Sequence, residues 1–185
     1  QFWVKLFCRP CPKIGHIRDV MGVAHLLEHL VFKGTDKYST LQIAQKIEAL
    51  GGEINAFTAK EHTCYHTSTL SEDFDICMDV LSQLFFRATI DNDEFEKEKM
   101  VVLQEILMAK DDIEDRVFDS FFEKSYKDHP LGTMILGTES SIEEMARDRV
   151  FDWYRNVYKP ENLIISVAGN VTHKERVEKA EEDLG

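Results

Sequence analysis

The chain has 185 residues, 43% of them hydrophobic, and a formal net charge of −12. A chain of this length can bury a hydrophobic core as one domain. The excess of acidic side chains argues against a nucleic-acid partner, because phosphate binding requires a basic face. The charge either serves solubility or provides a negative field that attracts cationic peptides. No apolar run approaches the roughly 18 residues of a transmembrane helix, and no positively charged signal peptide opens the sequence.

The first 21 residues carry few clear signals. Residues 2–7 are expected to form a short strand, and a turn rich in proline follows. Cys8 and Cys11 form a C-x-x-C pair, which is typical of a redox site or half of a zinc site, but no second pair completes it. With Cys64 and Cys77 they are too few for a disulfide framework in a chain of this length. We expect reduced thiols without a chemical role, which favours a bacterial cytoplasm or a mitochondrial matrix.

Residues 23–32 are predicted to form one helix, because neither proline nor glycine interrupts a dense apolar run. Within that run stand His25, Glu28 and His29. Positions i, i+3 and i+4 share a helix face, so two imidazoles and a carboxylate project from one patch. Neutral imidazoles spaced in this way can bind one Zn²⁺, and the carboxylate can take a proton from a water beside the metal.

In a different interpretation the two histidines are core residues whose hydrogen bonds are satisfied, and the glutamate is partly exposed. That reading suits a lone histidine in an apolar helix. It explains three polar groups less well, because burying them together without a partner costs on the order of several kcal/mol. The pattern H-x-x-E-H is also the inverted zincin signature, and such a site needs a third ligand.

The remaining elements follow from capping and periodicity signals and indicate an α+β chain without internal repeats. The first of these are a helix over 39–50 opened by a capping box of Ser39 and Gln42, a hairpin of strands 53–58 and 62–70, and a helix over 71–87. A long helix follows, capped by Asp91 with Glu94 as its box partner; it runs past Leu107 and resumes over 113–126. The last are a loop over 129–138, a short helix capped near Ser140, a helix ending at Tyr158, a strand over 163–168, and a charged helix capped by Thr172.

The long helix after Asp91 offers the carboxylates from which a third ligand can come. Most of them are expected to form a solvated face. Glu105 differs because it stands among the most apolar residues of this helix, and Glu98 lies two turns earlier on the same side. One of the two can complete a His₂Glu site with an open fourth position, and the other can orient a ligand imidazole.

With Glu105 standing 76 residues after His29, the sequence resembles the pitrilysin/insulysin family of zinc peptidases. The resemblance is greatest to the β subunits of mitochondrial processing peptidase and to bacterial proteins like them. It implies that His25, His29 and Glu105 bind zinc, that Glu28 is the catalytic base, and that Glu98 is a supporting carboxylate. Further matching stretches are 32–35, 50–58, 129–132, 135–138 and 160–163.

The resemblance also implies a fold and a mode of substrate binding. The fold is a mostly antiparallel sheet with helices packed on it, the N-terminal half of a subunit of this family. The strand with Asn55, Ala56 and Phe57 is expected at the sheet edge, where an extended peptide adds as a further strand. Asn55 can hydrogen-bond the substrate, and Phe57 either lines a pocket or packs in the core. Acidic side chains favour basic peptides.

Two features depart from the family pattern. Residues 1–21 are an atypical lead-in, and no second half is present within 1–185, which we therefore interpret as a single N-terminal metallopeptidase domain. The function expected is that of a zinc-dependent endopeptidase domain that is weak or inactive without a C-terminal half or an oligomeric partner. The alternative is a non-catalytic structural or peptide-binding subunit, although such relatives usually lose the motif that is intact here.

Overall fold

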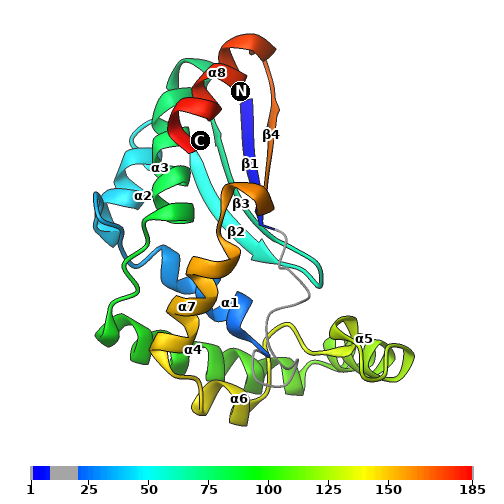
Figure 1. Ribbon diagram of the computed structural model, residues 1–185. Helices are drawn as coiled ribbons and strands as arrows, with labels where there is room; N and C mark the ends of the chain where they lie inside the picture. The colour runs from blue at the N-terminus through cyan, green and yellow to red at the C-terminus, as the bar shows by residue number, and fades with distance from the viewer. Residues whose placement is uncertain (1, 9–20, 185) are drawn as a thin grey trace.

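A computed structural model describes residues 2–8 and 21–184 of the chain. Its four strands are β1 (Phe2–Cys8), β2 (Glu53–Thr58), β3 (Thr63–Thr69) and β4 (Leu163–Ala168). They form one antiparallel sheet in the order β2-β3-β1-β4, so β2 and β4 are its edges (Figure 1). The strand expected over residues 2–7 is therefore a central strand. The Pro-rich turn, Cys11 and the rest of residues 9–20 lie outside the described residues.

The helices follow the expected order, and those that touch the sheet lie on one of its faces (Figure 1). The α+β class and the antiparallel sheet predicted from the sequence are confirmed. The helices are α1 (Val23–Val31), α2 (Thr40–Glu48), α3 (Phe74–Phe86), α4 (Asn92–Asp111), α5 (Ile113–Ser125), α6 (Glu139–Glu143), α7 (Arg147–Val157) and α8 (His173–Leu184), with 3-10 turns at Ser71–Asp73, Pro130–Gly132 and Pro160–Asn162.

The alternation of side chains along the strands separates a buried face from an open one. Phe2, Val4 and Leu6 of β1 point toward the helices and are fully buried. On the helical side α3 buries most of its apolar residues, among them Phe74 and Met78. The opposite face of the sheet carries exposed residues such as Trp3, Phe57 and Ile164, and no helix of the described ranges packs there. The core thus lies between the sheet and its single layer of helices.

Helix ends agree with the expected caps at α2 and α4 and differ at α6. The Ser39 hydroxyl and the Gln42 side chain form the predicted capping box of α2. Asp91 caps α4, but the Glu94 carboxylate pairs with Lys97 and does not complete a box. The short helix α6 is capped by Thr138 and not near Ser140, because Thr138 bonds the Ser141 N–H while the Ser141 hydroxyl accepts from the Thr138 N–H.

Three cysteines lie within the described residues, and all three are free and buried: Cys8, Cys64 and Cys77. Burial raises the pKa of the Cys8 thiol to about 12 and that of Cys64 to about 11. Both thiols are therefore protonated at neutral pH, as expected for thiols that only pack. No helix among residues 21–184 is long and apolar enough to cross a membrane.

Candidate metal centre

Helix α1 is amphipathic, and its polar side carries the predicted motif. Five of its nine residues are buried against the sheet and neighbouring helices, whereas His25, Glu28 and His29 are only partly covered and lie on the side toward α4 and β2. Gly22 precedes the helix in a left-handed conformation at φ +82°, and a Cβ there would lie 2.6 Å from the carbonyl oxygen of Leu136. A glycine is therefore required where the motif helix begins.

Helix α4 brings the two predicted glutamates to the motif. Glu98 and Glu105 lie seven residues apart, about 10.5 Å along one side of the helix. Glu98 is buried, and its side chain is 7% exposed, whereas that of Glu105 is 38% exposed. The apolar setting expected around Glu105 is only half present, because Val101 and Leu107 are themselves exposed. What sets Glu105 apart is its position opposite the histidines.

Three side chains from α1 and α4 converge on one point. Oε2 of Glu105 lies 3.7 Å from Nε2 of His25 and 3.6 Å from Nε2 of His29. One donor atom from each residue lies within 4.8 Å of the others. Ligand atoms of a tetrahedral zinc lie about 3.4 Å apart, given bonds of about 2.0–2.1 Å. These separations therefore leave room for a cation that draws its ligands slightly closer.

Unpaired polar atoms also indicate a cation site between α1 and α4. Oε2 of Glu105 is shielded from solvent, as is Nδ1 of His25, and neither has a hydrogen-bond partner among the described residues. A buried carboxylate oxygen without a partner is costly, and a bound ion is one of the explanations for such an atom. The donor set of two imidazoles and one carboxylate suits Zn²⁺. The residues present therefore fit a zinc ion.

The hydrogen bond of His29 and the pKa of His25 both favour metal binding. Nδ1 of His29 lies 3.0 Å from Oε2 of Glu98. Because a carboxylate only accepts, Nδ1 is the donor in this bond, and Nε2 is the ring nitrogen that faces the centre. Burial, together with the nearby His29, lowers the pKa of His25 to about 4, so that His25 is neutral at pH 7. Lys33, which the sequence analysis included only in the matching stretch 32–35, pairs with Oε1 of Glu98 at 2.8 Å.

Glu28 is held from the sheet rather than from α4. Its Oε2 accepts a hydrogen bond of 2.5 Å from the hydroxyl of Thr58, the last residue of β2. Burial is the largest influence on Glu28 and raises the pKa of this carboxyl group, and the hydrogen bond from Thr58 opposes that rise. Sequence reasoning gave Thr58 no role. The only signal available was the alternation of Ala56 and Thr58 with Asn55 and Phe57, which puts Ala56 and Thr58 on one face of the strand.

Strand β2 is an edge strand, as the family resemblance implied, and its side chains divide between the two faces. Ala56 and Thr58 lie toward α1, whereas Asn55 and Phe57 lie on the open face. Phe57 is 43% exposed and contacts the rings of His62 and His66, so a core role for it is excluded. The Ala56 N–H donates to the side-chain oxygen of Asn55 at 2.8 Å, which indicates that this donor points to the unpaired edge of β2 and not toward β3.

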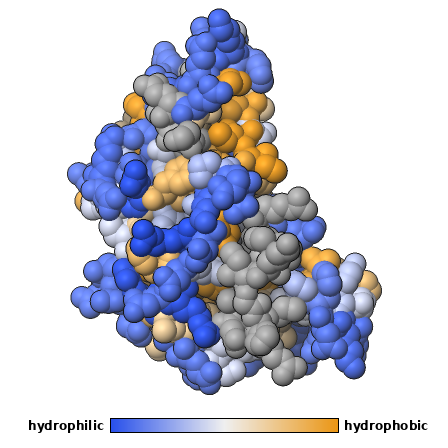
Figure 2. All heavy atoms as spheres, viewed as in Figure 1, coloured by the Kyte–Doolittle hydropathy of each residue, from blue (hydrophilic) through white to orange (hydrophobic). Residues whose placement is uncertain are grey.

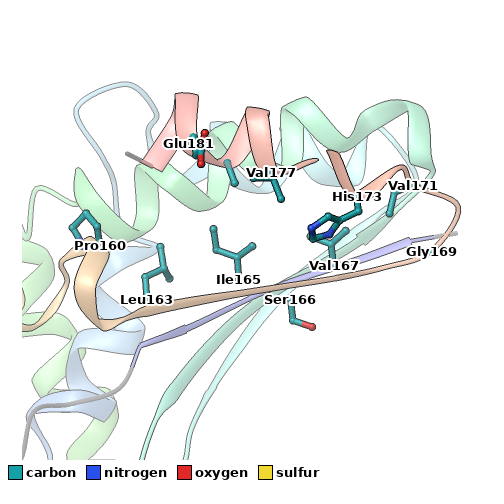
Figure 3. A pocket seen from close by; sticks show the side chains of 11 residues that line it. Pro160, Leu163, Ile165, Ser166, Val167, Gly169, Val171, His173, Val177 and Glu181 are labelled. Carbon is teal, nitrogen blue, oxygen red and sulfur yellow. The ribbon is translucent and has the colours of Figure 1, made fainter. Parts of the chain in front are cut away.

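A groove of about 740 Å³ lies elsewhere, between β4 and α8 (Figure 3). Leu163, Ile165 and Val167 of the strand face Val177 and His173 of the helix across it. The molecular surface is mostly hydrophilic in Figure 2, and an apolar patch over β4 marks this region. The groove lies at the opposite edge of the sheet from β2 and contains none of the residues predicted to bind metal or substrate.

Comparison with known proteins gives the chain a family. The profile described as "Insulinase (Peptidase family M16)" matches residues 15–139, and the profile "Peptidase M16 inactive domain" matches residues 144–185. Strand β4, which lies in the second range, joins the same sheet as β2 and β3 of the first. The two matched ranges therefore share one sheet.

Curated relatives are zinc proteases by name and are longer than this chain. An uncharacterized zinc protease of Mycobacterium leprae is 42% identical over 166 residues, which are 90% of this chain and 37% of the relative. The uncharacterized zinc protease YmxG of Bacillus subtilis is 41% identical over 154 residues, 83% of this chain and 38% of the relative. The chain thus spans about two fifths of the length of these relatives.

Solved structures support the fold. A protease from Helicobacter pylori superposes with a TM-score of 0.92 at 23% identity, over 98% of this chain and 44% of that one. A structure titled peptidase M16 inactive domain, from Pseudomonas fluorescens, superposes with a TM-score of 0.86 at 18% identity, over 98% and 44% of the two chains. The insulinase profile matches more than half of the residues, which confirms the family expected from the motif: the chain belongs to the insulinase (M16) family of peptidases.

Proposed function

We propose that this chain is the zinc-binding domain of a metalloendopeptidase. His25, His29 and Glu105 are its proposed ligands, Glu28 is its base, and Glu98 orients His29. The observation that carries the proposal is that one possible ligand atom from each of His25, His29 and Glu105 lies within 4.8 Å of the others, next to the Glu28 carboxylate on α1. The names of the relatives, zinc proteases, support the choice of metal and reaction.

The proposed chemistry is hydrolysis of a peptide bond. A bound Zn²⁺ supplies Lewis-acid chemistry, in that it acidifies water and polarises a carbonyl oxygen. Glu28 takes the proton from the attacking water and passes it to the leaving amine. Its raised pKa suits this role, because burial brings the carboxyl group closer to the range in which it can both accept and release a proton. His25 and His29 would hold the metal through Nε2, the ring nitrogen of each that faces Glu105.

We propose that the substrate is an extended peptide that adds to the open edge of β2. Adding a strand requires free backbone donors and acceptors on that edge, and the Ala56 N–H is one of them once the Asn55 side chain turns away. Asn55 can then hydrogen-bond the substrate, and Phe57 can contact it from the open face of the sheet and not from the interior of the site. The net charge of −12 favours basic peptides.

The proposed activity belongs to a larger assembly. Because the relatives are more than twice as long, we propose that a C-terminal half or an oligomeric partner completes the site and that these 185 residues alone are weak or inactive. The cited relatives are bacterial, which favours a bacterial compartment over the mitochondrial matrix. The subgroup of processing peptidases stays a prediction, as does the alternative of a non-catalytic peptide-binding subunit.

The test is zinc content measured together with hydrolysis of a basic peptide, with and without a chelator, on these residues alone and on the natural protein that carries them. We expect one zinc per chain, cleavage by the natural protein that the chelator abolishes, and slow or no cleavage by the 185 residues. Zinc binding without cleavage by the natural protein would favour the non-catalytic alternative. Full activity of the isolated 185 residues would contradict the need for a second half.

Glu98→Gln should weaken zinc binding without removing a ligand. The amide still accepts from Nδ1 of His29, but it no longer carries the charge that strengthens this hydrogen bond and that pairs with Lys33. Loss of such a supporting carboxylate costs about 10- to 100-fold in metal affinity. Competition with a chromogenic chelator measures the change, and Glu96→Gln, an exposed position on the same helix, serves as the control. Equal affinities in the two variants would contradict the supporting role.

A further inference from the structure

A series of hydroxyl groups runs from Glu28 into the core. The Thr58 hydroxyl bonds Oε2 of Glu28 at 2.5 Å and lies 3.2 Å from the hydroxyl of Thr63. Tyr65, two residues after Thr63 on the same face of β3, shares a separate hydrogen bond of 2.7 Å with the hydroxyl of Tyr158. The hydroxyls of Thr63 and Thr58 thus form a hydrogen-bonded series that ends on a carboxylate, and a bonded pair of tyrosines is buried beside it.

Rigid elements hold the two threonines and the two tyrosines beside them. Thr58 and Thr63 are paired residues of β2 and β3 at the closed end of their hairpin. Tyr65 is an inward residue of β3, and Tyr158 directly follows α7. Thr63, Tyr65 and Tyr158 are each at most 5% exposed. Thr58 is therefore supported from behind by groups that cannot turn toward solvent.

The direction of the hydrogen bonds is fixed by the carboxylate. An ionised Glu28 only accepts, so Thr58 donates to it, and because a hydroxyl has one proton Thr58 must accept from Thr63. Hydrogen bonds aligned in this way polarise one another and strengthen the last bond in the series. Burial raises the pKa of Tyr65 and Tyr158 well above the ordinary value, so the bond between them joins two protonated hydroxyls.

We propose that Thr58 is a positioning residue that sets the orientation of the Glu28 carboxylate, and that Thr63 fixes Thr58 in turn; this inference rests on the proposed function of Glu28 as base. The terminal torsion of a glutamate is broad, so a carboxylate without a partner samples many orientations. A charge-assisted bond of about 2.5–2.7 Å removes that freedom. Because Oε2 is engaged by Thr58, Oε1 is the oxygen that we assign to proton transfer.

The test compares Thr58→Val, which removes the hydroxyl and keeps the shape, with Thr58→Ser, which keeps the hydroxyl. In the natural protein that carries these residues, we expect Thr58→Val to lower kcat by about 10- to 100-fold, the effect of a misplaced catalytic group. KM and zinc affinity should stay at their wild-type values, and Thr58→Ser should restore most of kcat. Thr67→Val is the matched control, since Thr67 is fully buried in β3 and its hydroxyl has no hydrogen-bond partner in the described structure.

A second measurement does not depend on activity. In the zinc-free protein, denaturant unfolding of Thr58→Val, Glu28→Met and the double variant gives the coupling between the two side chains. A hydrogen bond to a charged group predicts a coupling of about tenfold or more in the folding constant. Thr67→Val combined with Glu28→Met should show none, because the Thr67 hydroxyl is not bonded to Glu28 or to the series.

These measurements separate the inference from the function on which it rests. Thr58→Val with a wild-type kcat, or with a change in KM alone, would overturn the positioning role while cleavage by the wild type still supported the function. An equal loss of kcat in Thr67→Val would overturn it as well, because the loss would then follow from removing any buried hydroxyl and not from the bond to Glu28. If the zinc-loaded wild type cleaves nothing, the proposed function fails, and a coupling near zero in zinc-free protein would show separately that Thr58 does not hold Glu28.

Discussion

Glu105→Gln should cost the chain its zinc. The carboxylate is the only charged member of the proposed ligand set, and an amide oxygen is a much weaker ligand for Zn²⁺. Loss of a supporting residue costs roughly 10- to 100-fold in affinity, and we expect loss of a direct ligand to exceed that range. Peptide cleavage should disappear with the metal. The effect is among the largest expected from any single change, because two neutral imidazoles alone do not hold the ion.

Thermal unfolding with and without zinc separates a ligand from a residue that merely packs. At a free zinc concentration of 100 times Kd, the wild type should gain about 2.7 kcal/mol of stability, and Glu105→Gln should gain almost none. Without zinc the variant should be as stable as the wild type or more so, because Oε2 of Glu105 is buried there without a partner. Glu96→Gln on the same helix should behave as the wild type in both conditions. A Glu105→Gln protein stabilised by zinc as strongly as the wild type would remove Glu105 from the ligand set.

The sequence predicted the parts of this site that depend on one helix. Because i, i+3 and i+4 share a face in any α-helix, the relation among His25, Glu28 and His29 needs no tertiary information. The density of apolar residues around them likewise predicted correctly that most of the remaining residues of α1 are buried. The same local logic predicted the capping box at Ser39 and the cap at Asp91, since capping involves only neighbouring residues.

Relations between elements could not be derived in this way. Helix periodicity put Glu98 and Glu105 on one side of α4 but could not say which of them lies opposite the histidines, since that depends on how α4 crosses α1. Periodicity in a strand is similarly incomplete: Asn55 and Phe57 must share a face, but not necessarily the face toward α1. Thr58 was overlooked for the same reason, because its partner Glu28 lies 30 residues away on another element.

Helix α5 shows a further limit of pattern reasoning. Its apolar residues repeat at helical spacing, which ordinarily indicates a buried stripe. In the structure none of its residues is buried, and Ile113, Val117 and Phe121 are each at least 60% exposed. A periodic pattern reports that a helix has an apolar face, but it does not report whether that face is covered by the residues at hand.

Glu28→Gln should abolish cleavage and leave zinc in place. The amide occupies the same volume and still accepts from Thr58, but it cannot take a proton from water. General-base catalysis contributes about 10²- to 10⁴-fold, so kcat should fall by that factor while zinc affinity stays at the wild-type value. Glu48→Gln, an exposed position on α2, is the control. Cleavage by Glu28→Gln at the wild-type rate would mean that another group is the base.

Stability supplies an independent check on the same substitution. Burial raises the pKa of Glu28, so the folded protein holds this proton more tightly than the unfolded chain does, and the ionised form is disfavoured in the folded state. Stability from this group is therefore lost as the pH rises through that range, and at neutral pH the wild type keeps a buried charge at a cost. Glu28→Gln removes the charge, so its unfolding midpoint in the zinc-free protein should equal or exceed that of the wild type at pH 7. A variant that loses both activity and stability would indicate a structural defect, whereas lost activity with preserved or increased stability is the behaviour of a residue retained for chemistry.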